Sequence, residues 1–355
     1  MRAAHVVAAS ARGRPSARGR RRTPGRVDRE DGAIVRLQLS ADPGLPGHEG
    51  SPRTPPHDGE AAAREDRLDA AVRRRWDRID WTRPIPPEAL VIPEAHYMDV
   101  AGLGLTERQR VAINRLFACF TCELFIHFEG YVIRYLERSA HRAPYLSAPV
   151  VARFVAEERT HAEMFRRLLH RLRPDLYPTD AAPPRFLRWG RGDDAALRLA
   201  PAGTFFLLAW YFEEITLFVP RAIEARPDQS AALVAEIMAL HAREEAPHVA
   251  IDERVLLHLN ERCPRWLAAI QTALALPFLV YVDGVVGDAW RRLVASAGSE
   301  LGLDAAQRRR LGARAPTQSD RWGTESFTRK LEGRGLAGAR PLCWALRRAL
   351  RTDPA

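Results

Sequence analysis

The chain has 355 residues, of which 46% are hydrophobic, so it is long enough to bury one large core or two smaller ones. Its formal net charge is +10, but residues 1–26 carry eight arginines and no acid. The remainder is therefore close to neutral, which argues against a nucleic-acid-binding face on the folded part. Four cysteines are too few for a disulfide framework in a chain of this length and favour a reducing cytoplasm.

Signals for export and for membrane insertion are weak. The N-terminus lacks the apolar core of a secretory signal. No apolar run reaches the roughly 20 residues that a membrane span needs, so we expect no membrane partner. Cys119 and Cys122 form a CxxC, but the pair lies in an apolar helical run without a second CxxC, and core packing is its expected role.

The composition divides the chain into four parts. Residues 1–60 are rich in Arg, Pro and Gly and are expected to form a disordered tail. Residues 61–105 form an N-terminal extension that is helical to Trp76 and then extended, because prolines disfavour helix. Residues 106–300 are expected to form a helical bundle, and residues 301–355 a C-terminal helical extension.

Apolar periodicity predicts five long helices in the bundle region. A capping box of Thr106 and Gln109 opens the first, and Thr204 is expected to cap the third. A proline-rich connection separates the second helix from the third. The expected helices span residues 106–139, 149–173, 204–225, 229–262 and 266–294, with weaker ones at 305–313, 319–331 and 341–351.

The fourth helix carries three polar residues on its apolar face. His241, Glu245 and His248 stand at i, i+4 and i+7, which places them on one side of a helix. Burying them without partners would be costly, and a metal ion removes that cost. Pro247 lies between two of them and is expected to bend the helix or free a carbonyl.

A second group with the same spacing lies on the second helix, where Glu158 and His161 form an ExxH inside the apolar stripe. A single ExxH is usually a solvated pair. Two of them, on helices that alternate with acidic apolar helices, match dimetal bundles, in which two helices each supply a Glu and two supply an ExxH. The residues alone leave the choice open on the first helix (Glu123 or Glu129), the third (Glu213 or Glu214) and the fourth (Glu244 or Glu245).

The separations between the acids agree with this topology. Glu123 and Glu158 are 35 positions apart, and Glu214 and Glu245 are 31 apart, as expected for neighbouring antiparallel helices. Glu158 and Glu214 are 56 apart because the proline-rich connection intervenes. Two hairpins joined by one long crossover are the order of a ferritin-like bundle, so the predicted fold is an all-α, ferritin-like four-helix core with flanking helices. Oxygen and imidazole ligands without thiolate favour iron, with manganese as the alternative.

At these residues the chain resembles the p-aminobenzoate N-oxygenase family of ferritin-like non-haem di-iron oxygenases, over about residues 106–260. The family pattern is a lone Glu, an ExxH, a second lone Glu and an HxxxExxH. The resemblance implies two iron ions and decides the open choices in favour of Glu123, Glu214 and Glu245. The implied metal ligands are Glu123, Glu158, His161, Glu214, His241, Glu245 and His248. Asp252, one turn after His248, is a candidate to orient a ligand imidazole from behind, and a surface salt bridge is its alternative role.

The resemblance also implies O2 as a co-substrate, an external electron donor and a homodimer. The expected reaction is oxygenation of an arylamine nitrogen through hydroxylamine and nitroso to nitro products. The alternatives are a di-iron hydroxylase acting on another biosynthetic intermediate, for example a carrier-bound one, and a non-catalytic ferritin-like metal-binding protein. A helical interaction protein without metal is a further alternative.

Overall fold

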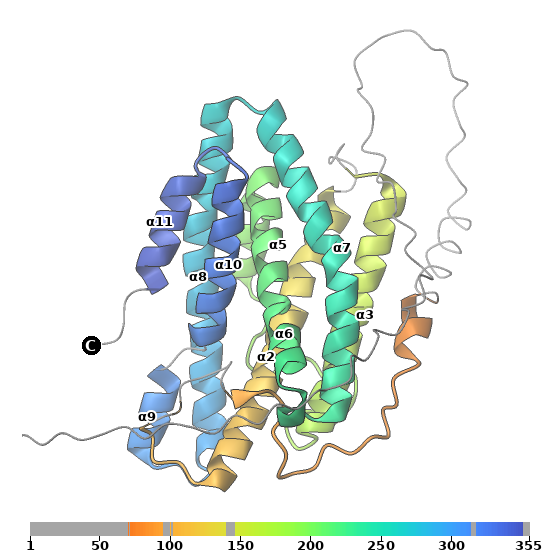
Figure 1. The fold of residues 1–355 in the computed structure, drawn as a ribbon, viewed down its shortest axis with the longest axis vertical. Coiled ribbons are helices and arrows are strands. Elements are labelled where there is room, and N and C mark those ends of the chain that lie inside the picture. Colours follow the sequence, from red (N-terminus) through yellow and green to blue (C-terminus); the bar gives the residue numbers. More distant parts are fainter. Residues whose placement is uncertain are drawn as a thin grey trace, which may run out of the picture. The chain divides into compact units, whose positions relative to one another are not determined.

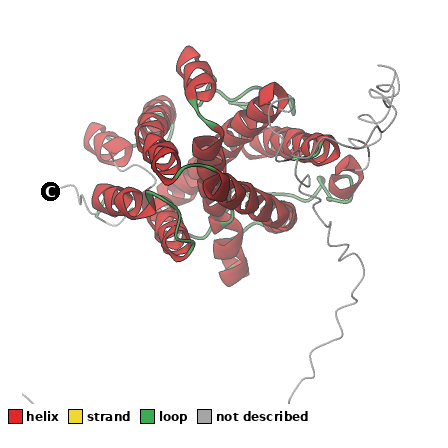
Figure 2. Ribbon diagram, turned by 90° about the horizontal axis from the view of Figure 1, so that it is seen from above, coloured by secondary structure: helices red, strands yellow, loops and turns green. Residues whose placement is uncertain are grey.

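A computed structural model describes residues 70, 72–94, 100, 102–139, 146–313 and 317–350. These residues belong to one structural unit, which spans Gln38–Ala355. Every regular element among them is a helix (Figures 1 and 2), so the all-α prediction is confirmed. The tail predicted at residues 1–60 lies outside the described residues.

Four helices make up the centre of the unit: α2 (Glu107–Ser139), α3 (Ala148–Leu172), α5 (Ala202–Thr216) and α7 (Ala232–Arg262). Helix α2 packs along α3, and α5 packs along α7. The connection between the two pairs contains α4 (Arg191–Leu199), a short helix that the periodicity did not predict. The arrangement of two hairpins joined by one long connection agrees with the prediction.

The starts of the helices follow from local chemistry, with one correction. Thr106 and Gln109 form the predicted reciprocal capping box, in which each backbone N–H bonds the other side chain. Thr204 does not cap α5, because the helix begins at Ala202 and the Thr204 hydroxyl donates to the carbonyl of Gln271, 2.7 Å away. The third predicted helix also divides in two, since α5 ends at Thr216 and α6 spans Phe218–Ala225.

The long helix α7 continues through Pro247. A proline inside a helix leaves the carbonyl four residues earlier without its usual partner, but it does not by itself end the helix. His241, Glu245 and His248 all remain on the buried side of α7, each 0–1% exposed. The predicted shared face is therefore present.

Further helices cover the four central ones. Helix α8 (Arg265–Gly298) packs against α5, and α10 (Thr317–Gly333) packs against α5 and α6. Helix α11 (Ala339–Leu350) packs on α8 and α10, whereas α9 (Ala305–Ala313) packs on α8. A short 3-10 turn, η2 (Pro227–Gln229), precedes α7. These helices agree with the flanking helices that the sequence predicted.

Three helical stretches are long and apolar enough to cross a membrane: Glu107–Arg138, Ala202–Ala225 and Arg265–Gly298. The expectation that no segment reaches this length was wrong. In the first two, 83% of the most apolar window is buried inside the protein, so core packing explains their composition. In the third, only 22% is buried, and Trp266, Ile270 and Val280 are among the exposed side chains.

The N-terminal segment, residues 72–94, runs beside α3 and α7 and is held to both by ion pairs. Arg73 pairs with Glu163 of α3 at 2.9 Å, and Arg83 pairs with Glu236 of α7 at 2.8 Å. Between these contacts Trp76 is buried, with 5% of its surface exposed. The segment therefore forms an N-terminal strap across the bundle and brings Arg75 and Trp76 close to its centre.

Candidate metal centre

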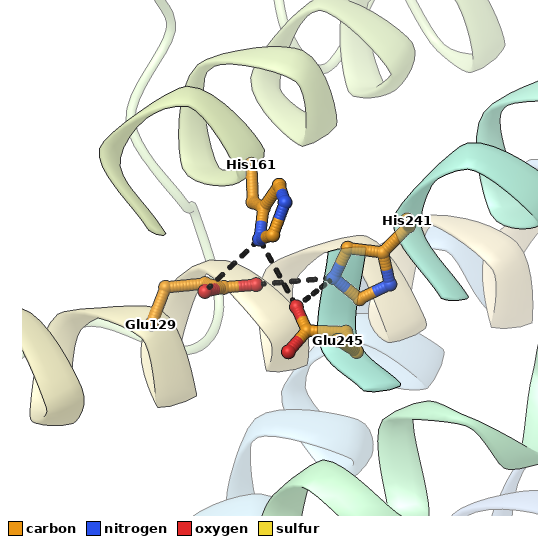
Figure 3. A group of neighbouring side chains, drawn as sticks. All are labelled: Glu129, His161, His241 and Glu245. Carbon is orange, nitrogen blue, oxygen red and sulfur yellow. Dashed lines mark ion pairs between the residues drawn. The ribbon is translucent and has the colours of Figure 1, made fainter. Parts of the chain in front are cut away.

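Seven acidic and histidine side chains meet in the middle of the four central helices. Helix α2 supplies one, α3 two, α5 one and α7 three, and each is 0–5% exposed. They form two groups in which the candidate ligand atoms all lie within 4.8 Å of one another. The first group is Glu129, His161, His241 and Glu245 (Figure 3), and the second is Glu158, Glu213, Glu245 and His248.

Glu245 belongs to both groups and so joins them. Its Oε1 lies 3.0 Å from His161 Nδ1 and 2.7 Å from His241 Nε2. Its Oε2 lies 3.0 Å from His248 Nδ1. A carboxylate that turns one oxygen to each of two groups is suited to bridge two metal ions. The first group then offers two imidazoles and the second offers one, so the two positions are chemically unequal.

Several of these inward-facing atoms lack hydrogen bonds although they are buried. Both carboxylate oxygens of Glu158, His161 Nδ1 and His241 Nε2 make no hydrogen bond among the described residues, and their close contacts are ion-pair distances to other members of the cluster. Burying such groups without partners is costly, but bound cations would accept their lone pairs. Four carboxylates also match the charge of two divalent ions. The residues therefore fit a pair of oxygen- and imidazole-bound metal ions.

The pKa values show the same crowding of acids. Burial, together with the charge of Glu245 and a hydrogen bond to it, raises the pKa of Glu213 well above its ordinary value. Burial alone would raise the pKa of Glu245, but the charge of His241 and the hydrogen bond from Glu213 hold it well below that value. These opposite shifts favour a proton on Glu213 that bonds Glu245, and a bound cation could replace that proton.

A second layer of acids holds two of the histidines from behind. His161 turns its Nε2 to Glu244 Oε2 at 2.9 Å, and His248 turns its Nε2 to Glu157 Oε2 at 3.0 Å. A carboxylate on the far nitrogen fixes the orientation of the ring and strengthens the near nitrogen as a ligand. Burial raises the pKa of Glu157, but the hydrogen bond and charge of His248, with help from two arginines, bring it down to about 2.

Arg75 of the N-terminal strap joins these two outer acids. Its Nη2 donates to Glu157 Oε1 at 2.9 Å, and its Nη1 lies 2.7 Å from Glu244 Oε1. The Trp76 indole N–H donates to Glu244 Oε2 at 2.9 Å. One guanidinium group therefore connects the supports of both histidines.

Aromatic rings fix the imidazoles further. Phe154 stacks on His248 with ring centroids 3.9 Å apart, and Phe125 stacks on His241 at 5.4 Å. Trp76 meets His161 edge-on at 5.7 Å. Close packing of this kind limits each ring to one orientation and keeps water away from the cluster.

The family model for the p-aminobenzoate N-oxygenases matches residues 58–330, which is most of the chain. The chain belongs to this oxygenase family. The match includes the four central helices, α8 and the N-terminal strap, and it agrees with a ferritin-like helical fold. No curated protein and no solved structure matches the chain.

Five of the seven residues expected from the family pattern lie together in the cluster: Glu158, His161, His241, Glu245 and His248. The choice of Glu245 over Glu244 agrees with the geometry, because Glu244 lies one layer further out. The other two, Glu123 and Glu214, are not brought to the cluster.

Glu129, not Glu123, is the acid that α2 contributes. The two are six positions apart on one helix and so point to different sides. The Glu123 carboxylate instead accepts hydrogen bonds from the Tyr177 hydroxyl at 2.7 Å and from three consecutive backbone N–H groups, at residues 185–187. It anchors the connection after α3. Glu129 lies 3.4 Å from His241 Nε2 and 3.8 Å from His161 Nδ1.

Glu213, not Glu214, is the acid that α5 contributes. Adjacent residues on a helix differ in direction by about 100°. Glu214 therefore faces α10, where the ammonium group of Lys330 donates to it, and Arg221 lies 4.0 Å away. The structure thus differs from the two expected choices, because spacing along the chain does not resolve which of two nearby acids faces inward.

Asp252 does not occupy either of the positions that the sequence suggested for it. The residue is buried, at 1% exposure, so it makes no surface salt bridge. The outer nitrogen of His248 is bound by Glu157, however, and neither Asp252 oxygen has a hydrogen-bond partner among the described residues. Burial, with the nearby acids Glu158 and Glu245, raises the pKa of Asp252 well above its ordinary value, despite an opposing effect of His248.

Sequence reasoning did not find the outer positions of these acids, since Glu157 was not singled out and Glu244 was considered only as an alternative to Glu245. The signal was present, because each ExxH is directly preceded by a second glutamate, giving EExxH twice. The extra glutamate of each motif binds the histidine of the other motif across the α3–α7 contact.

Proposed function

We propose that this chain is an O2-dependent di-iron oxygenase that oxygenates the nitrogen of an arylamine. The observation that carries the proposal is the cluster of four carboxylates and three imidazoles, arranged around a shared Glu245, in a member of this oxygenase family. The residues that would hold the metal pair are Glu129, Glu158, His161, Glu213, His241, Glu245 and His248. When bound, iron supplies the ability to activate O2, which the side chains of the protein lack.

The protein contributes position and exclusion of water. The four helices keep the seven side chains nearly dry, which strengthens their electrostatic interactions with a metal. Glu157 and Glu244 fix two of the three imidazoles, and the raised pKa of Glu213 favours a proton on its carboxyl group when no cation is bound. The unequal imidazole count of the two groups is expected to make one iron richer in nitrogen ligands than the other.

The chemistry requires electrons from outside. Inserting one oxygen atom of O2 into an amine N–H bond gives a hydroxylamine, and the second oxygen leaves as water after taking up two electrons and two protons. A GxGxxG stretch occurs at residues 333–338, but it joins α10 to α11 and follows a helix, whereas a dinucleotide-binding fingerprint follows a strand. We therefore propose an external electron donor.

The test combines metal analysis with product analysis. Purified protein is expected to bind about two iron ions per chain, and after anaerobic reduction and O2 addition it should convert an arylamine to a hydroxylamine or more oxidised product detected by mass spectrometry. Oxidation of only carrier-bound substrates would favour the hydroxylase alternative. Iron uptake without any organic product, in a multi-subunit cage, would favour metal storage and refute the oxygenase proposal.

A further inference from the structure

A surface pocket of about 430 Å³ lies over the N-terminal strap and α7. It is lined by Arg75, Arg78, Ile79, Glu236, Leu240, Arg243 and Glu244. None of the seven cluster residues lines it. Glu244 forms part of the pocket wall and, on its other side, binds the outer nitrogen of His161. The pocket therefore approaches the metal centre from behind a histidine.

The pocket carries unbalanced positive charge. Its two acids are compensated, since Glu236 pairs with Arg83 at 2.8 Å and Glu244 pairs with Arg75 at 2.7 Å. Arg78 and Arg243 are exposed and have no ion pair within the described part of the chain. Asp77, the neighbouring exposed acid of the strap, does not line the pocket. A surface with this charge favours an acidic partner.

A short bonded route leads from this surface to the cluster. Arg75, whose side chain is 39% exposed, contacts Glu244 at 2.7 Å, and Glu244 contacts His161 Nε2 at 2.9 Å. The buried Trp76 donates to the same Glu244 oxygen and meets the His161 ring edge-on at 5.7 Å. Two contacts thus connect an exposed guanidinium group to the imidazole that faces the metal position.

The position of the pocket shows whether an electron donor or a substrate would bind there. A substrate in the pocket would face the outer side of Glu244 and could not touch a group bound at His161 Nδ1. An electron needs no such contact, because it can pass through the bonded side chains. The position and the charge together therefore favour a redox protein over a small anionic substrate.

We propose that the pocket is the docking site of an acidic one-electron carrier protein, and that Arg75, Trp76 and Glu244 connect the carrier to His161. The inference rests on the proposed di-iron function, which requires external electrons. Each reduced carrier would give up one electron to one ferric ion, so two carriers would return a ferric pair to the ferrous state. Such encounters bury little surface and depend strongly on charge.

The experiment uses the full, iron-loaded chain and a reduced plant-type [2Fe–2S] ferredoxin as the acidic carrier. The test variant is Arg78→Glu/Arg243→Glu, and the matched control is Arg309→Glu/Arg310→Glu on α9, which packs on α8 and carries the same change of charge. Reduction is followed by absorbance, with a sulfonated viologen as a small reductant. Ferredoxin affinity is measured by calorimetry.

We expect the test variant to be reduced by ferredoxin about tenfold more slowly than the control at low ionic strength, with the difference shrinking as salt is added. Viologen should reduce both equally. Trp76→Phe, which loses the N–H bond to Glu244, should bind ferredoxin normally but be reduced severalfold more slowly at saturation.

Three outcomes would overturn the proposal: no reduction of the wild type by ferredoxin, equal ferredoxin rates in test and control variants, or a docking effect that is unchanged by salt. The first two leave the proposed oxygenation intact if viologen-reduced protein still converts an arylamine. Conversely, a specific loss of ferredoxin reduction in a protein that oxidises no amine would support docking and sink the proposed reaction. A chain that binds no iron would overturn both.

Discussion

Removing Arg75 should weaken metal binding although the residue touches no metal ligand. Its guanidinium group bonds Glu157 and Glu244, the acids that hold His248 and His161 from behind. In Arg75→Met each acid keeps other partners, since Glu157 retains Arg153 at 3.0 Å and Glu244 retains the Trp76 indole. The variant therefore loosens the histidines without leaving a bare buried charge.

The size of the effect follows from the environment of the three groups. Loss of a partner that orients a ligand typically lowers metal affinity by about 10- to 100-fold, or about 1.4–2.7 kcal/mol. The two acids have side chains only 5% and 3% exposed, which favours a large effect, but Arg75 itself is 39% exposed and partly screened by solvent. We expect the lower end, about tenfold, or about 1.4 kcal/mol.

The assay is an anaerobic competition titration of Fe2+ against a chelator, for Arg75→Met and for Arg73→Met. Arg73 lies on the same strap and pairs with α3, but it and its partner Glu163 are 53% and 50% exposed, so its loss should change little. Arg75→Lys should recover part of the affinity, because it can restore one of the two bonds. Equal affinity of the two methionine variants, with circular dichroism showing both folded, would refute this reasoning.

Three further predictions concern the cluster and its surroundings. Glu129→Ala should lose the metal of the group that contains His161 and His241, so that metal analysis finds about one iron per chain. Glu123→Ala should keep both irons but lower the melting temperature measured by calorimetry, since four donors lose their acceptor. The opposite result for the two variants would support the family-based choice of Glu123. Asp193 is buried, which raises its pKa, but hydrogen bonds from His127, Tyr131 and the Gly190 N–H lower it from 3.8 to about 2. The stabilisation from the Asp193 carboxylate is therefore present above pH 3.8 and lost as pH falls towards 2. Over that range the free energy of unfolding from urea titrations should fall by about 2 kcal/mol more in wild type than in Asp193→Asn. An equal fall in both proteins would contradict this prediction. Chelation of iron should lower the melting temperature by mass action and leave the helix content near that of the loaded protein, and an unchanged melting temperature would mean that the cluster binds metal weakly or not at all.

The sequence was sufficient to predict the helices and their order because long apolar periodicity and hairpin spacing are strong signals. The two ExxH groups and His241 were placed correctly in the cluster for the same reason, since each set repeats at helical offsets within an apolar stripe. Details at helix ends were less predictable. Thr204, which resembles a cap in sequence, lies inside α5 and donates to the carbonyl of Gln271 on α8. Helix α4 lies in a stretch that the sequence predicted to be a loop.

The choice between neighbouring acids failed for a geometric reason. Glu129 and Glu158 are 29 positions apart, which suits an antiparallel hairpin as well as the 35 between Glu123 and Glu158. Which acid faces the cluster depends on the rotation of α2 and on the backbone N–H groups that the following connection presents to Glu123. Neither the helix rotation nor these backbone contacts can be inferred from the local sequence.

The doubled EExxH motif gives a physical reason why the outer acids could not be placed from one helix alone. Within a motif the two glutamates differ by about 100° in direction, so when the second faces the cluster the first faces the neighbouring helix. Helices α3 and α7 lie side by side in this bundle, and each first glutamate therefore reaches the histidine of the opposite motif. This exchange ties the two helices together through their own ligands. Arg75 completes it from the strap, so the metal centre depends on a residue 82 positions before Glu157, the nearer of the two acids that it supports.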